Sequence, residues 1–264
     1  MALIRRNSKS PFQKEWDAVC KKEKSFLERR RSKKDSALNL LLAEKVPEKL
    51  QHTLDKAFEK AFGLIFEKGT AVIEKTYHRE NLEKEFKINQ YADEVYGNRK
   101  SLRKFSKKAG RAGSVNLALS GVTGVGMGLV GVGIPDIPVF TGMILKCIYE
   151  IALDYGFTYD SQEEKYFILL LIEGATSYGE KLESVDSKIE AFIQEPKLPE
   201  AYKQEEQIAS TSRSLSGELL YMKFLQGIPV VGAVGGAYDM VYMKQISEYA
   251  QMKYRKRFLL NKIV

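Results

Sequence analysis

Cysteine and histidine are nearly absent from this chain of 264 residues, which contains two of each. Cys20 and Cys147 are 127 residues apart. Such scarcity excludes a small secreted domain held by disulfides, and free thiols are typical of a cytoplasmic protein. With only His52 and His78 available, a histidine-rich metal site is excluded as well.

Motifs of the common enzyme classes are also missing. The sequence contains no G-x-x-x-x-G-K-[ST] phosphate loop and no G-x-S-x-G nucleophile elbow. Residues 126–131 match G-x-G-x-x-G, but Pro135 and Pro138 interrupt the helix that a dinucleotide site requires. We therefore expect no cofactor and no metal. No apolar stretch precedes the first charges, so we also expect no signal peptide.

Positive charge is present in excess, and it is concentrated at the N-terminus. The formal net charge is +8, and residues 1–34 alone hold 12 Lys and Arg against 4 Asp and Glu. The remaining 230 residues are balanced, with 30 charges of each sign. This distribution predicts a neutral body with a basic N-terminal arm. Such arms bind nucleic acid, anionic lipid or an acidic protein surface, although a solvated helix explains the charges equally well.

Apolar residues recur at helical spacing through most of the chain. Phe12, Trp16, Val19 and Phe26 form one narrow stripe, and Gly156 is placed to end a later helix. The segment 167–172 is apolar on all sides, which indicates a buried helix. The pattern predicts helices over 11–34, 47–78, 80–96, 139–156, 160–180 and 184–193.

Two uncharged glycine-rich runs stand out in the second half. Residues 112–135 carry no charge over 24 positions, long enough to cross a bilayer, and residues 224–238 are uncharged again. Gly124 and Gly128 lie four residues apart, as do Gly232 and Gly236. Small residues at this spacing allow close helix packing. We expect two apolar helical hairpins, 113–156 and 224–252, that pack together through these glycines.

A basic cluster accompanies each apolar run, and we expect both clusters to contact a membrane or a partner. Such clusters attract anionic lipid headgroups. Leu102 and Phe105 lie away from the charges of the first cluster on a helix. The predicted contact residues are Arg99, Lys100, Arg103, Lys104, Lys107, Lys108 and Arg111 in the first cluster and Lys253, Arg255, Lys256 and Arg257 in the second.

Three carboxylates in apolar surroundings are the candidates for catalysis. Burial raises the pKa of a carboxyl group, which is how a general acid is made. Asp136, Glu150 and Asp239 fit this description, but Asp136 fits a helix cap equally well and Glu150 can pair with Lys146. We therefore assign no catalytic residue and keep a hydrolase that uses these three side chains as the alternative function.

Residues 113–175 resemble the EcsC protein family. The resemblance depends on the glycine-rich lead-in, on the Pro-Asp-Ile-Pro segment 135–138, on Glu150-Ile-Ala, and on Tyr155-Gly156. Residues 228–257 resemble the C-terminal signature of that family, although Asp239 stands where family members often have Asn. The family is named for a protein encoded beside an ABC transporter. The resemblance implies no established activity and no catalytic residues.

Together these observations predict an all-α multi-helix bundle around the two glycine-rich hairpins. We expect a basic N-terminal helix or arm at 1–34, a charged helical half at 35–111, and an apolar core at 112–264 with a linker near 195–217. The favoured function is a non-enzymatic cytoplasmic protein on the inner face of the membrane. It would bind anionic lipid or a membrane protein such as an ABC transporter. Nucleic-acid binding through the basic arm is a further alternative, but its aromatic residues fit a core stripe better than a stacking platform.

Overall fold

The computed structural model describes residues 9–33, 45–68, 70–110, 137–226 and 232–262. Within these ranges the chain forms helices and no strands, which confirms the all-α prediction. Residues 99–110 are also helical. The labelled helices are α1 (Pro11–Arg29), α3 (Glu48–Lys68), α4 (Ala71–Glu74), α5 (Arg79–Tyr96), α7 (Ile137–Asp154), α8 (Gln162–Ala175), α9 (Gly179–Gln194), α10 (Gln204–Gln226) and α11 (Gly232–Leu260).

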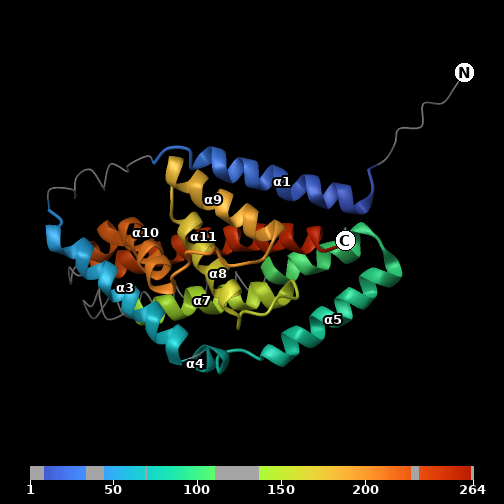
Figure 1. Cartoon of the computed structure of the whole chain (residues 1–264), viewed down its shortest axis with the longest axis horizontal. Coiled ribbons are helices and arrows are strands. Elements are labelled where there is room, and N and C mark those ends of the chain that lie inside the picture. Colours follow the sequence, from blue (N-terminus) through green and yellow to red (C-terminus); the bar gives the residue numbers. More distant parts are fainter. Residues whose placement is uncertain (1–8, 34–44, 69, 111–136, 227–231, 263–264) are drawn as a thin grey trace, which may run out of the picture.

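The long helix α11 runs through the middle of the bundle (Figure 1). It packs against α1, α7, α8, α9 and α10. From Met243 to Leu259 most of its residues are buried, including tyrosines, lysines and an arginine, while Lys244 and Glu248 are exposed. Each buried charge of such a helix needs a partner. The partners are described in the next subsection.

The expected apolar segments form part of the core. α7 packs directly on α11, and residues 167–172 of α8 are fully buried, as the sequence predicts. Gly124 and Gly128 lie outside the described residues. Gly232 and Gly236 fall within the first turns of α11, but the surroundings of these two positions are not described. Packing through the four glycines therefore stays a prediction.

Local sequence signals explain most of the helix ends. Ser10 caps α1 by accepting a hydrogen bond from the backbone N–H of Gln13, at 3.1 Å. Ser161 caps α8 in the same way from Glu164. The side chain of Glu164 does not complete a capping box, because it lies in a buried ion pair with Arg257. The sequence analysis therefore locates the start of α8 correctly but misses the partner of Glu164.

Two segments differ from the prediction. The helix expected over 47–78 ends at Lys68, next to Gly69, and a separate short helix, α4, follows. The linker expected near 195–217 covers only 195–203, since α10 begins at Gln204. The serines and threonines of 210–216 are placed inside α10, where Thr211, Ser212 and Ser216 are fully buried.

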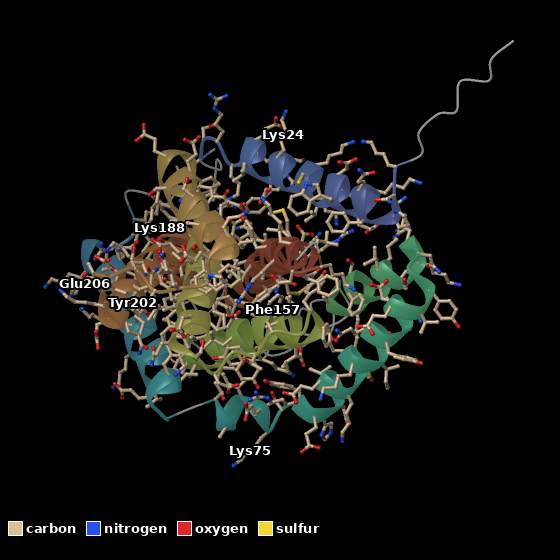
Figure 2. All side chains as sticks on the ribbon, turned by 45° about the vertical axis from the view of Figure 1, so that its right-hand side comes forward. Lys24, Lys75, Phe157, Lys188, Tyr202 and Glu206 are labelled. Atoms are coloured by element: carbon tan, nitrogen blue, oxygen red, sulfur yellow. The ribbon has the colours of Figure 1, made fainter. Side chains whose placement is uncertain are left out.

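The N-terminal helix is docked and is not a free arm. Val19 and Phe26 of α1 are buried in the core, and Phe12 and Trp16 are partly buried against it. The aromatic stripe is thus a packing surface, as the sequence analysis favoured. These rings are not available as a platform on which bases could stack. Figure 2 shows Lys24 on the outer side of α1, away from the bundle.

Gly156 closes α7 in a conformation that only glycine adopts easily. Its φ is +81°, and a Cβ atom added here would overlap the ring of Phe86 from α5. Gly156→Ala should therefore destabilise the protein by about 2–4 kcal/mol, from the strained backbone and the displaced ring. Urea denaturation measures the change in the free energy of unfolding.

Gly63→Ala is the matched control, because Gly63 lies inside α3 with no atom within 4 Å of an added Cβ. This variant should be as stable as the wild type or more stable by up to about 1 kcal/mol, since alanine favours a helix. Equal stability of the two alanine variants would contradict the close approach of α5 to Gly156.

Candidate functional site

The helix at residues 99–110 presents a basic face to solvent. Gly97 ends α5 in the left-handed conformation, and the Asn98 side chain accepts hydrogen bonds from the backbone N–H groups of Lys100 and Ser101 at 2.9 and 3.0 Å. The next helix therefore begins at a fixed point. Leu102, Phe105 and Ala109 are buried. The rings of Phe105 and Phe258 of α11 lie 4.7 Å apart, so this helix is held against the bundle by its apolar side.

Four cations occupy the outward side of this helix: Lys100, Arg103, Lys104 and Lys107, all of them exposed. Among the described residues, none of these four side chains forms an ion pair within 4 Å. The sequence analysis assigned the apolar and basic sides of this segment correctly. The four exposed cations are named the basic face below.

The other three cations of the first cluster have different surroundings. Arg99 donates to the Glu15 carboxylate of α1 at 2.6 Å. Lys108 pairs with Glu85 of α5 and lies 3.3 Å from an oxygen of Asp154 in α7. Arg111 lies outside the described residues. Arg99 and Lys108 thus connect helices within the bundle, and only part of the predicted contact surface is free to meet a partner.

The second basic cluster, on α11, is buried, and its prediction as a contact surface is wrong. Lys253 has no exposed surface, and its ammonium nitrogen lies 2.5 Å from Glu23, 2.6 Å from Asp186 and 2.8 Å from Glu190. Lys256 lies 2.6 Å from carboxylate oxygens of both Glu23 and Glu190. The two ammonium groups and three carboxylates form one cluster that joins α1, α9 and α11, and we name it the lysine–carboxylate cluster.

The remaining two cations of α11 are also neutralised inside the protein. Arg255 contacts Glu15, the residue that also holds Arg99. Arg257 lies 2.7 Å from Glu164 of α8, which accepts a further hydrogen bond from Tyr254 at 2.6 Å. All four charges of this segment are therefore used to hold α11 against α1, α8 and α9. Lys253, Lys256 and Arg257 are buried, and Arg255 is partly exposed at the groove between α1 and α11.

The lysine–carboxylate cluster also bears on metal binding. One oxygen from each of Glu23, Asp186 and Glu190 lies within 4.8 Å of the others, which is close enough to share a cation. The Lys253 ammonium already lies among them and supplies that positive charge. Burial disfavours its charged form, but the negative charges of Asp186, Glu23 and Glu190 outweigh burial and raise the pKa of Lys253. A metal ion would have to displace this charged lysine.

A test of the cluster is the replacement of Lys253 by methionine, which keeps the volume and removes the charge. Loss of one partner leaves buried carboxylates that repel each other, and breaking such a pair costs about 3–5 kcal/mol. Thermal and urea denaturation should both show this loss. Lys188→Met on the exposed side of α9, labelled in Figure 2, is the control and should change stability by less than about 0.5 kcal/mol. A Lys253→Met protein as stable as this control would contradict the cluster.

The candidate catalytic carboxylates are not brought together in the described residues. Asp136 lies outside them, and Asp239 lies in α11 at a position whose surroundings are not described. Glu150 is half-buried on α7. The described part of the chain therefore gives the hydrolase alternative no assembled site.

The carboxyl group with the most unusual surroundings is one that the sequence analysis missed. Asp154 ends α7, one turn after Glu150, and its side chain is almost completely buried. Burial raises its pKa to about 7, against the opposing charge of Lys108. The available signal was its position at the end of an apolar helix, next to the Tyr155-Gly156 turn.

The raised pKa of Asp154 predicts how stability changes with pH. The folded protein holds this proton up to about pH 7, whereas the unfolded chain releases it near the ordinary carboxyl pKa of 3.8. The folded state binds more protons between these values, so the contribution of Asp154 becomes more destabilising as pH rises from 4 to 7. Asp154→Asn should therefore gain stability over the wild type at pH 8 and lose this advantage at pH 5. Urea denaturation at both pH values measures the difference, and an equal effect at both would show that Asp154 does not hold the proton.

A groove of about 680 Å³ lies between α1 and α11. Its floor includes Val19, Phe26 and Met252, and its rim includes Lys21 and Lys22. Apolar surface beside positive charge suits an amphipathic anion. The groove lies against the same end of the bundle as the helix 99–110, since Ser106 also lines it.

The described part of the chain is a helical bundle with ion pairs in its core and a basic face on the helix 99–110. The sequence model of the EcsC protein family matches residues 13–259, so the chain belongs to this family. Protein EcsC of Bacillus subtilis (strain 168) is 28% identical over 139 residues, which are 52% of this chain and 55% of that protein. The chain thus spans about half the length of this curated relative. No solved structure matches the chain.

The family assignment confirms the resemblance deduced from the sequence. It also extends that resemblance over α1 and the first half of the chain, which the sequence analysis matched only loosely. Across the described ranges, none of the helices has both the length and the apolar composition needed to cross a bilayer.

Proposed function

We propose that this protein attaches to the surface of an anionic membrane through the basic face of the helix 99–110. The observation that carries the proposal is the contrast between the two basic clusters. The cations of α11 are paired within the protein, whereas Lys100, Arg103, Lys104 and Lys107 are exposed and have no ion-pair partner among the described residues. A helix face of this kind suits phosphate headgroups, and each cation near the surface contributes about 1 kcal/mol.

In this proposal the protein lies on the cytoplasmic face of the membrane. Its function there is binding and involves no enzymatic step. The attachment would be peripheral and electrostatic, so it weakens as salt shortens the Debye length to about 3 Å at 1 M. A membrane protein with an acidic cytoplasmic surface, such as an ABC transporter, is the alternative ligand for the same face. Binding to vesicles that contain no membrane protein distinguishes the two ligands. The protein should still bind such vesicles if its ligand is lipid, and should not bind them if its ligand is a transporter.

Charge reversal of the basic face tests the proposal. The variant Lys100→Glu, Arg103→Glu, Lys104→Glu, Lys107→Glu should bind vesicles of phosphatidylcholine and phosphatidylglycerol at least about a thousandfold more weakly, from four contributions of about 1 kcal/mol. Co-sedimentation measures the binding. The fold should be retained, because all four side chains are exposed. Lys108 is left unchanged, since it pairs with Glu85 and Asp154.

A matched variant separates the local face from total charge. Lys60, Lys75, Lys188 and Lys197 are exposed on other parts of the protein. Their reversal to Glu lowers the formal net charge from +8 to zero, as does reversal of the basic face. This control should bind vesicles much more tightly than the basic-face variant. Equal binding of the two variants would contradict a localised site, and no binding of the wild type at low salt would reject lipid as the ligand.

A further inference from the structure

The helix α5 carries a row of large apolar side chains that point into solvent. Ile88 is 67% exposed, Tyr91 70%, Val95 59% and Tyr96 69%. The spacing of three and four residues places Ile88, Tyr91 and Val95 on one side of the helix, and Tyr96 follows at its C-terminal end. Seven large hydrophobic side chains are exposed in the described part of the chain, and these four are the most exposed of them. An exposed apolar row of this density indicates a surface that something else covers.

The opposite side of α5 holds the helix in place. Phe86 packs on Phe105 with ring centres 5.6 Å apart, and Leu82 is partly buried against the core. Asp93 is buried and accepts hydrogen bonds from Ser101 and Lys262, both at 2.5 Å. The bond to Ser101 joins α5 to the helix 99–110. The apolar row is therefore displayed on a fixed element and does not result from a helix that has failed to pack.

The helix α5, which carries the apolar row, is joined to the helix 99–110 by a short turn (Figure 1). Tyr96 and Lys100 are four residues apart, so their Cα atoms lie at most about 14 Å from each other. The exposed charges of α5 itself are mixed, since Lys84 pairs with Glu80, and Glu85 and Glu94 are exposed as well as Lys87. The cations next to the row are therefore those of the basic face. Aromatic and aliphatic side chains next to several cations are the composition of elements that lie in the interface of an anionic bilayer.

We propose that Ile88, Tyr91, Val95 and Tyr96 insert into the interfacial layer of an anionic membrane while the basic face binds the headgroups. This inference rests on the proposed function and adds an apolar contact to it. Tyrosine suits the position, because its ring is apolar and its hydroxyl stays hydrated. The ligand is the phospholipid bilayer itself, with its anionic headgroups and upper acyl carbons.

The charges argue against a second copy of this chain as the occupant. A symmetric dimer through the apolar row would bring the basic face of one copy close to the other copy's basic face, since the row and the face adjoin. Such like-charge contacts oppose association. An anionic lipid surface, in contrast, matches both the apolar row and the cations around it.

The test uses the full chain with Ile88→Ser, Tyr91→Ser and Val95→Ser combined. On vesicles of phosphatidylcholine and phosphatidylglycerol, the wild type should keep part of its binding in 1 M salt, because apolar insertion does not depend on charge. The triple variant should bind about tenfold more weakly at low salt and lose all binding at high salt. Its melting temperature should match the wild type, since the three side chains are exposed.

Val241→Ser is the matched control. Val241 is 55% exposed on α11 and lies about 25 Å along that helix from Phe258, which contacts Phe86 of α5. The Val241→Ser variant should bind vesicles as tightly as the wild type at both salt concentrations. Triple-variant binding equal to this control would overturn insertion while leaving electrostatic attachment in place, whereas absence of wild-type binding at low salt would overturn both.

A second measurement reports how deeply the apolar row of α5 inserts into the bilayer. Tryptophan fluorescence of Tyr91→Trp, after subtraction of the parent signal from Trp16, should be quenched by vesicles that contain brominated acyl chains. The same measurement on Val241→Trp should show no quenching. The inference would be overturned if the mass of the wild type in solution doubled with concentration while the triple serine variant stayed monomeric. That result would identify a second copy of the chain as the occupant of the apolar row.

Discussion

The lysine–carboxylate cluster is the interaction on which the arrangement of the bundle depends. Lys253 and Lys256 belong to the central helix, Glu23 to α1, and Asp186 and Glu190 to α9. Each of these charges would carry a large desolvation cost if it were buried alone. Buried together, they fix the position of three helices, because any shift would leave a charge without its partner.

The same requirement decides which parts of the surface are free to act. Glu15 neutralises Arg255 and Arg99, and Glu164 neutralises Arg257. Among the described residues, exposed cations without an ion pair within 4 Å remain on the outer side of the helix 99–110 and also along α1, at Lys14, Lys21, Lys22 and Arg29. The distribution of acidic side chains thus neutralises the cations of α11 inside the protein and leaves those on the outer helices exposed. The apolar row of α5, held by Asp93 and Phe86, adjoins that basic face.

Sequence patterns predicted the architecture better than the site. The buried α8, the docked aromatic stripe of α1 and the helix end at Gly156 all follow from local periodicity and side-chain chemistry. The burial of Lys253 does not, because its partners lie 63 or more residues away in the chain. A signal was nevertheless present: Glu23 falls on the same helical stripe as Val19 and Phe26. A charge at a core position of an amphipathic helix requires a buried partner, and the lysines of α11 were candidates.

Lysine labelling in the presence and absence of anionic vesicles tests the central claim most directly. With a soluble acylating reagent and mass spectrometry, Lys253 should stay unmodified in both conditions, because it has no exposed surface. Lys100, Lys104 and Lys107 should react readily in solution and become protected on vesicles, while Lys188 should react equally in both. Rapid labelling of Lys253 in solution, or unchanged labelling of the basic face on vesicles that bind the protein, would contradict the account.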